Sequence, residues 1–345
     1  MDEAEIELLC IGNALVDVFA PSTVKELDSL GITEPVQHVA PEKIQEILLA
    51  FPGAFSSAGG GSANTAKVAA GLGVSTIFVG SVGDDRLGQF YETELVAAGT
   101  AFRLFRSVLP TGICVMFQLP GGKTRIAASP GAALELKREH IDDELIRKTK
   151  VVVLDGFILH REDLTRYILD RANQYGTVVA LDVGSAEIAE ERAAEIIRYS
   201  REYPLILFMN EAETRAFYTG GAAKNNAADE EDDTGNNREI HRIYRFLRKL
   251  TTDELFPIIV VKQGSRGSTV FAGGAVHRNA IPAIIPKDST GAGDAFCAAF
   301  LAAWLRGKSL AECSGLGNRI ARETLRVNGA NIDRKKLAHI AKTRL

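Results

Sequence analysis

The sequence has little of what marks several common protein classes. It contains four cysteines, no two of them in a Cys-x-x-Cys pair, and six histidines without His-x-His or His-x-x-x-His spacing. A disulfide framework and a structural zinc site are therefore not expected. Lysine and arginine total 40 against 44 acidic residues, which leaves no basic field to attract nucleic acid or anionic lipid.

Long apolar segments are also missing. The longest, residues 295–305 between Asp294 and Arg306, is too short to cross a bilayer. The first residues are acidic and lack the basic start of a signal peptide. We therefore expect a cytoplasmic protein, a monomer or a homodimer, without membrane or nucleic-acid partners.

The chain is long and apolar enough to bury a large core, with 345 residues of which 46% are hydrophobic. Near-continuous apolar runs, typical of parallel strands buried on both faces, alternate with helical patterns that end at Gly73, Gly99 and Gly176. We expect helices from Ser62, from Asp84 or Asp85, and from residue 163. The strands are predicted at residues 7–11, 76–79, 151–155, 177–182, 205–210 and 258–262. This alternation predicts one α/β domain over residues 1–345, with a doubly wound, mostly parallel sheet.

Two segments depart from this alternation. Between residues 101 and 129, short apolar runs surround Pro-Gly-Gly, which is hairpin chemistry. Together with residues 13–40 they are predicted to form a small β-sheet lid, for which a plain surface extension is the alternative. Residues 220–237 are polar and acidic and are predicted to form a surface insertion.

The most informative segment is Asp-Ser-Thr-Gly-Ala-Gly-Asp-Ala-Phe at residues 288–296. Gly291, Ala292 and Gly293 precede a helix, so that backbone N–H groups can approach an anion with little steric obstruction. Asp294 follows in the first turn, where a carboxylate repels a resting phosphate but can take a proton from an attacking hydroxyl. The alternative is that Asp294 only caps the helix.

Two further segments carry polar groups at the end of a strand or the start of a helix. Asn13 and Asp17 follow the first predicted strand, where α/β sheets bind ligands, and can together hold neighbouring sugar hydroxyls. Gly60 and Gly61 open a helix and permit close backbone approach, with Asn64 in its first turn. The segment of Asn13 and Asp17 alone is also compatible with an ordinary polar turn at a strand end.

Taken together, these segments resemble the paired signatures of the PfkB carbohydrate kinase family, which includes ribokinase and adenosine kinase. Asn13 and Asp17 match the family's substrate turn, and Gly-Asp-Asp-x-x-Gly at residues 83–88 matches its N-terminal stretch. Asn-x-x-Glu at residues 210–213 and Lys-Gln-Gly at 262–264 match its nucleotide-binding motifs. The family fold, a doubly wound core with a small β-lid, agrees with the expectation above.

The resemblance implies roles for individual residues. Asp294 would be the catalytic base and Gly291, Ala292 and Gly293 the anion hole. The acceptor would be bound by Asn13, Asp17, Gly60, Gly61 and Asn64. ATP would be bound by Asn210, Lys262, Gly264 and Gly267, and Mg²⁺ by Glu213 through water. Asp288 and Thr290 match positions that in many members hold K⁺.

The expected activity is transfer of the γ-phosphoryl group of MgATP to a hydroxyl of a small sugar or ribonucleoside. Adenosine kinase specifically is one alternative, and a catalytically silent binder of the same fold is another. A NAD-dependent oxidoreductase is disfavoured, because Phe296 stands where the dinucleotide fingerprint needs a third glycine.

Overall fold

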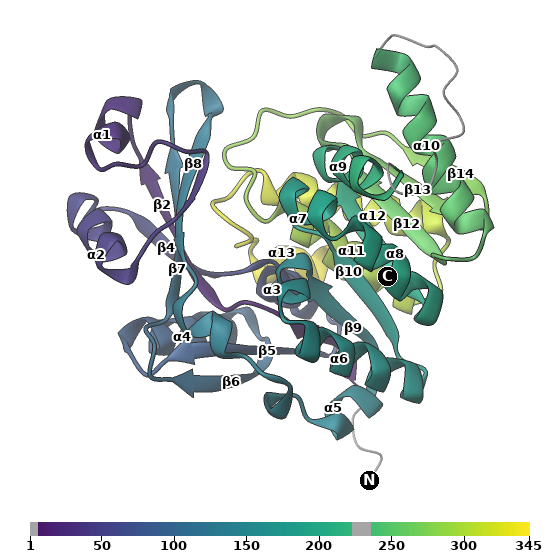
Figure 1. The fold of residues 1–345 in the computed structure, drawn as a ribbon, viewed down its shortest axis with the longest axis horizontal. Helices are drawn as coiled ribbons and strands as arrows, with labels where there is room; N and C mark the ends of the chain where they lie inside the picture. Colours follow the sequence, from purple (N-terminus) through teal and green to yellow (C-terminus); the bar gives the residue numbers. More distant parts are fainter. Residues whose placement is uncertain (1–5, 223–235) are drawn as a thin grey trace.

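The computed structural model describes residues 6–222 and 236–345, in which a large and a small sheet lie side by side (Figure 1). The large sheet has the strand order β14-β13-β12-β11-β10-β9-β1-β5-β6 and is parallel from β12 to β6, with β13 and β14 antiparallel. Its strands are β1 (Ile6–Ile11), β5 (Thr76–Gly83), β6 (Ala101–Ser107), β9 (Thr149–Asp155), β10 (Val178–Asp182), β11 (Leu205–Asn210), β12 (Ile258–Lys262), β13 (Ser268–Ala272) and β14 (Ala275–Asn279).

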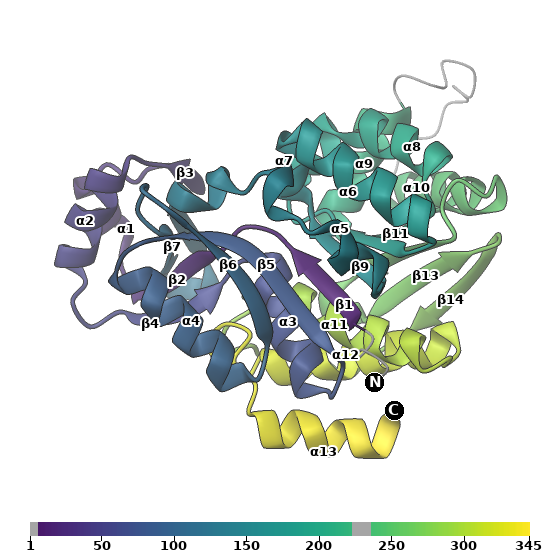
Figure 2. The same cartoon turned by 90° about the horizontal axis from the view of Figure 1, so that it is seen from below.

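Helices cover both faces of the large sheet, as the alternating pattern predicts (Figure 2). One face carries α3 (Gly61–Gly71), α11 (Ala292–Leu305) and α12 (Leu310–Thr324), with α13 (Arg334–Arg344) outside them. The other carries α5 (Asp143–Arg147), α6 (Glu162–Tyr175), α7 (Ala186–Glu191), α8 (Ala193–Glu202), α9 (Glu211–Ala222) and α10 (Asn236–Thr252). The helix α4 (Arg86–Ala98) connects β5 to β6. No described helix combines the length and hydropathy that a bilayer span requires.

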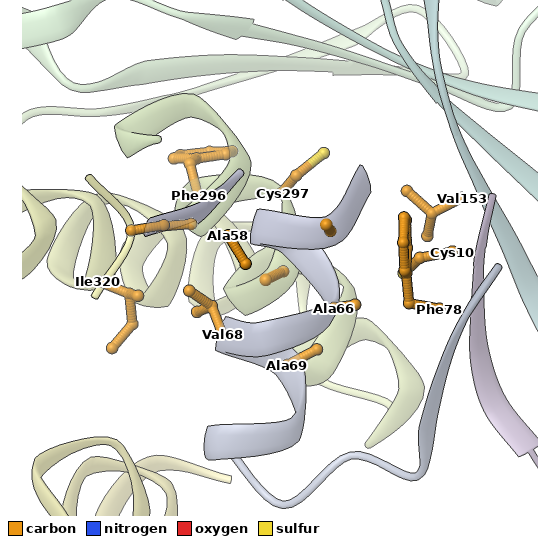
Figure 3. Close-up of a cluster of buried hydrophobic side chains, with 14 of the residues drawn as sticks. Cys10, Ala58, Ala66, Val68, Ala69, Phe78, Val153, Phe296, Cys297 and Ile320 are labelled. Atoms are coloured by element: carbon orange, nitrogen blue, oxygen red, sulfur yellow. The ribbon is translucent and has the colours of Figure 1, made fainter. Parts of the chain in front are cut away.

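The large sheet has an apolar core on each face, because successive side chains of each buried strand point to opposite faces. Leu8 and Cys10 of β1 face the core under α3 and α11, whereas Leu9 and Ile11 face the core under the helices of the opposite face. Figure 3 shows the first core, where small side chains of α3 and the start of α11 pack beside strand residues. Because α11 is buried from Ala295 to Ala303, its N-terminus is held firmly at the edge of the sheet.

The predicted helix starts are partly confirmed. Asp85, not Asp84, caps α4 by accepting a hydrogen bond from the Gly88 N–H (2.8 Å). The prediction that Ser62 caps its helix is wrong: the N-cap of α3 is Gly60 (φ 94°). The single O–H of Ser62 is instead shared between the Ile11 carbonyl and the Asp155 carboxylate, at 3.0 and 3.1 Å.

The small sheet confirms that the chain has a second sheet and corrects its predicted bounds. Its order is β3-β8-β7-β2-β4, with β2 (Leu15–Pro21), β3 (Val36–His38), β4 (Phe55–Gly59), β7 (Gly112–Gln118) and β8 (Thr124–Ser129); α1 (Val24–Ser29) and α2 (Pro41–Ala50) accompany it. The assignment of residues 101–129 as a whole to the lid is wrong, because β6 continues the β5–α4 unit and pairs parallel with β5. The boundaries 13–40 also miss β4, which pairs antiparallel with β2. The acidic segment predicted at 220–237 lies mostly outside the described residues.

Candidate active site

The predicted site residues come together at one edge of the large sheet. The parallel strands β12, β11, β10, β9 and β1 lie next to one another in that order, so their carboxyl ends form one row. The polar residues at or just after these ends are Lys262, Asn210, Asp182, Asp155 and Asn13. The N-termini of α3 and α11 meet at the same edge, because Asn64 donates a hydrogen bond to Asp294.

The N-terminus of α11 presents unpaired backbone donors. Its N-cap, Gly291, has φ 74°, and a Cβ there would lie 2.8 Å from the Ala330 Cβ. The Ala292 N–H donates to the Ser289 carbonyl at 3.3 Å, whereas those of Gly293 and Asp294 donate to no group among the described residues. Two free N–H groups at the positive end of a helix dipole can bind an anion such as a transferring phosphoryl group.

Asp294 is a buried carboxylate held from a second helix. Its Oδ2 accepts a hydrogen bond from the Asn64 Nδ2 (3.0 Å), and its carbonyl accepts one from the Thr65 hydroxyl (3.3 Å). The first turn of α11 has no side-chain cap, so the alternative role as a helix cap has no support in the geometry. Burial, together with the charges of Asp182 and Asp155, raises the pKa of Asp294 to about 7, against opposing effects of Asn64 and Lys262. A carboxylate with this pKa can exchange protons near neutrality.

Lys262 places a positive charge beside the anion site. Its ammonium donates to both oxygens of the Asp182 carboxylate at 2.7 Å, and a Cβ on Gly293 would lie 3.1 Å from the Nζ. Burial opposes the charge, but Asp182 and Glu213 outweigh it and raise the pKa of Lys262 above its ordinary value. The side chain therefore stays an ammonium ion at neutral pH.

Asn210 and Glu213 form a reciprocal cap on α9. The Glu213 carboxylate accepts from the Asn210 N–H (2.7 Å) and Nδ2 (2.5 Å), while the Asn210 Oδ1 accepts from the Glu213 N–H (2.9 Å). Burial raises the pKa of Glu213, with Lys262 opposing. In the described residues no three His, Cys, Asp or Glu side chains gather to hold a metal. Each Glu213 oxygen already accepts a hydrogen bond and keeps a further lone pair. That lone pair can accept a hydrogen bond from a water of hydrated Mg²⁺, because this ion keeps several of its waters.

The predicted acceptor-binding residues lie around the start of α3. A Cβ on Gly60 would lie 2.1 Å from the Asn13 carbonyl, and one on Gly61 would lie 3.5 Å from the Asp294 Oδ1. Asp17, on β2 of the small sheet, is 7% exposed and its carboxylate accepts no hydrogen bond from any described residue. Burial raises its pKa to about 7, although Lys67 opposes the shift. The carboxylate is thus available to a ligand hydroxyl.

The remaining predicted residues flank this row. The Asp288 carboxylate accepts from the Thr290 N–H (3.0 Å) and the Gly329 N–H (2.7 Å), and so ties the turn before α11 to a distant loop. Gly264 (φ 56°) has open space around it at the end of β12. Gly267 (φ 88°) lies in the same turn, and a Cβ there would lie 2.0 Å from the Asn279 carbonyl oxygen.

Three residues that contact the site, Asp155, Arg161 and Asp182, are not among the predicted site residues. Asp155 and Asp182 are the last residues of the apolar strands β9 and β10, a signal close to the one that identified Asn13, and therefore could have been found. Arg161 carries no such signal: its guanidinium reaches the Asn13 side chain across 148 positions of sequence.

Comparison with known proteins decides the family. The model of the pfkB family of carbohydrate kinases matches residues 24–337. The chain belongs to this family. It is 31% identical to a ribokinase of Arabidopsis thaliana over 284 residues, which cover 79% of this chain and 68% of the relative. It is 27% identical to adenosine kinase 1 of the same plant over 328 residues, covering 90% and 91%.

Solved structures agree with this assignment. The crystal structure of adenosine kinase from Sinorhizobium meliloti superposes with a TM-score of 0.84 at 25% identity, covering 99% of this chain and 100% of the other. A probable sugar kinase from Rhizobium etli gives 0.84 at 22% identity and 99% coverage of both chains, which supports the fold. This PfkB kinase is therefore a sugar or nucleoside kinase, and the family implies ATP as phosphoryl donor, usually with Mg²⁺.

Proposed function

We propose that this PfkB kinase transfers the γ-phosphoryl group of ATP to a hydroxyl of a ribose-containing or related sugar acceptor, with Asp294 as general base. The observation that carries the proposal is the Asp294 carboxylate, oriented by Asn64 and with a pKa near 7, beside the free N–H groups of α11. A protein that only binds nucleotide gains nothing from a negative charge beside a phosphate, whereas phosphoryl transfer needs a proton acceptor there.

The proposed step follows from these positions. The Asp294 carboxylate takes the proton of the acceptor hydroxyl as its oxygen forms a bond to the γ-phosphorus, and the bond from that phosphorus to the bridging oxygen breaks to release ADP. The N–H groups of Gly293 and Asp294, together with the Lys262 ammonium, offset the negative charge on the transferring phosphoryl oxygens. Asn13 and Asp17 hold the acceptor, and Gly60 and Gly61 let it approach Asp294.

The nucleotide would lie along the carboxyl ends of β11 and β12. Asn210, Gly264 and Gly267 would line its position, and Glu213 would hold Mg²⁺ through water. The ion would shield the phosphate charges. Asp288 and Thr290 would border a K⁺ ion next to the turn that carries Gly291.

A second candidate is adenosine kinase specifically, favoured by the Sinorhizobium meliloti structure. ADP release should be measured from MgATP with adenosine, inosine, ribose, fructose, 2-keto-3-deoxygluconate and ribose 1-phosphate. The last is included because an ATP-dependent ribose-1-phosphate kinase of Halopiger xanaduensis is 30% identical over 258 residues, covering 72% of this chain and 74% of that relative. Turnover of adenosine alone would support the second candidate. Release of no ADP with any acceptor would contradict both.

A further inference from the structure

Arg161 is a cation beside the acceptor site to which the proposed function assigns no role. It follows the short helix Gly156–His160 after β9 and directly precedes α6. Its Nη2 donates to the Asn13 Oδ1 (2.6 Å) and its Nη1 donates to the Ala133 carbonyl (2.8 Å). The guanidinium also lies close enough to Asp155 for the two charges to stabilise each other.

The contact with Arg161 fixes which end of the Asn13 carboxamide is free. A guanidinium has only donors, so the group that faces it must be the amide oxygen. The Asn13 Nδ2 then points elsewhere and donates to no acceptor among the described residues. Asn13 therefore presents an N–H donor, while Asp17, whose carboxylate has only acceptors when ionised, presents the complementary group.

This pairing matches two neighbouring hydroxyls of a sugar ring, one accepting from Asn13 and the other donating to Asp17. On the basis of the proposed function, we infer that Arg161 is a positioning residue that holds Asn13 as a hydrogen-bond donor to the acceptor substrate. Its second bond, to Ala133 in the turn that follows β8, ties the same guanidinium to the connection leaving the small sheet.

The two bonds explain why arginine suits this position. The Asn13 side chain and the Ala133 carbonyl belong to segments that follow different strands, and the planar fork of a guanidinium reaches both at once. An ammonium is a compact point charge that retains the attraction to Asp155 but does not reproduce the fork. A comparison of Arg161→Lys with Arg161→Met therefore separates the effect of the positive charge from the effect of positioning Asn13.

Four single variants test the inference with the best acceptor from the panel: Asn13→Asp, Arg161→Lys, Arg161→Met and, as control, Arg166→Met. Asn13→Asp keeps an oxygen facing Arg161 but has no N–H, so kcat/KM for the acceptor should fall about tenfold or more. Arg161→Met should show a similar fall, with the KM for ATP changed less than about twofold because the nucleotide is bound at β11 and β12. The control residue, Arg166, lies on α6, which Arg161 directly precedes. It pairs with Glu162 at the surface, and its replacement should leave both constants unchanged.

Arg161→Lys distinguishes positioning from charge balance. If Arg161 positions Asn13, the lysine variant should melt close to the wild type yet keep the low acceptor kcat/KM of the methionine variant. Combining Arg161→Met with Asn13→Ala should cost little more than either change alone, since both remove one oriented donor.

Full rescue by lysine, or an Asn13→Asp enzyme within about threefold of wild type, would overturn the inference. These outcomes are separate from failure of the proposed function, which would appear as a wild-type protein that releases no ADP. In that case, calorimetry measures the affinity of the wild type and of Asn13→Asp for the acceptors of the panel. The inference still requires that the variant binds the acceptor more weakly than the wild type. Equal binding, or none by either protein, would then overturn it.

Discussion

Replacing Asp294 with asparagine removes the charge of the proposed general base but keeps the hydrogen bond that orients it. An asparagine oxygen can still accept from the Asn64 Nδ2, so the local geometry is retained. Loss of the general base should lower kcat by about 10²- to 10⁴-fold. The wild-type kcat/KM should rise with pH and level off above about pH 7, because the base must be ionised and burial raises its pKa to about 7.

The same substitution should stabilise the protein above neutral pH. The pKa of Asp294 rises from 3.8 in the unfolded chain to about 7 in the folded one, so the folded state binds more protons between these values. Its stability therefore falls as the pH rises from about 4 to about 7, and Asp294→Asn lacks this loss. At pH 8 the variant should gain about 2 to 4 kcal/mol in unfolding free energy. The upper value converts the whole pKa shift at about 1.4 kcal/mol per unit, and the lower one allows for the part of the shift that is coupled to neighbouring charges. For a chain of 345 residues this is a rise in Tm of about 3 to 6 °C.

The assay combines ADP release with melting curves at pH 5 and pH 8. The Tm difference between variant and wild type should be larger at pH 8 than at pH 5. Asp163→Asn, which removes an exposed carboxylate on α6, serves as the matched control and should change neither turnover nor Tm. A folded Asp294→Asn protein that turns over within about fivefold of the parent would refute the general-base role.

Three further outcomes are expected. Lys262→Met should weaken ATP binding and lower the unfolding free energy by about 3 kcal/mol, because it leaves Asp182 buried without its partner. Adding Asp182→Leu should restore the stability, measured by denaturation, but not the ATP binding, measured by nucleotide titration. Glu213→Gln should raise the Mg²⁺ concentration for half-maximal turnover about tenfold, with unchanged acceptor KM, whereas an unchanged Mg²⁺ requirement would contradict a metal role. Amide exchange in β2, β7 and β8 should slow when the acceptor binds while β6 stays unaffected, and equal protection of β6 would argue against the corrected bounds of the lid.

The parts of the site that could be predicted from the sequence are those set by neighbouring residues. Gly291 and Gly60 each precede a helix, and both adopt the positive φ that their positions require. The buried strands were found because both of their faces are apolar. A parallel sheet then brings strand ends together without further information, which is why Asn13, Asn210 and Lys262 share one edge.

The rest depends on contacts between distant segments. Asp182 and Lys262 lie 80 positions apart, and neither residue by itself identifies the other as its partner. Ser62 has the composition of a cap, yet its hydroxyl bonds to Ile11 and Asp155, which the local sequence does not specify. Strand β6 resembles a hairpin strand in composition, and only its pairing with β5 assigns it to the large sheet.

The charge balance at the sheet edge explains why a backbone anion site is needed there. The buried or partly buried acids are Asp17, Asp155, Asp182, Glu213, Asp288 and Asp294, and the neighbouring cations are Lys67, Arg161 and Lys262. The acids outnumber the cations, and Lys262 is already engaged with Asp182, so side-chain charge alone does not favour a polyphosphate. Free N–H groups at the start of α11 add positive potential without adding a side chain that would neutralise Asp294. Burial, together with the same excess of acids, raises the pKa of Asp294 to about 7, which suits the proton transfer that we propose for this carboxylate.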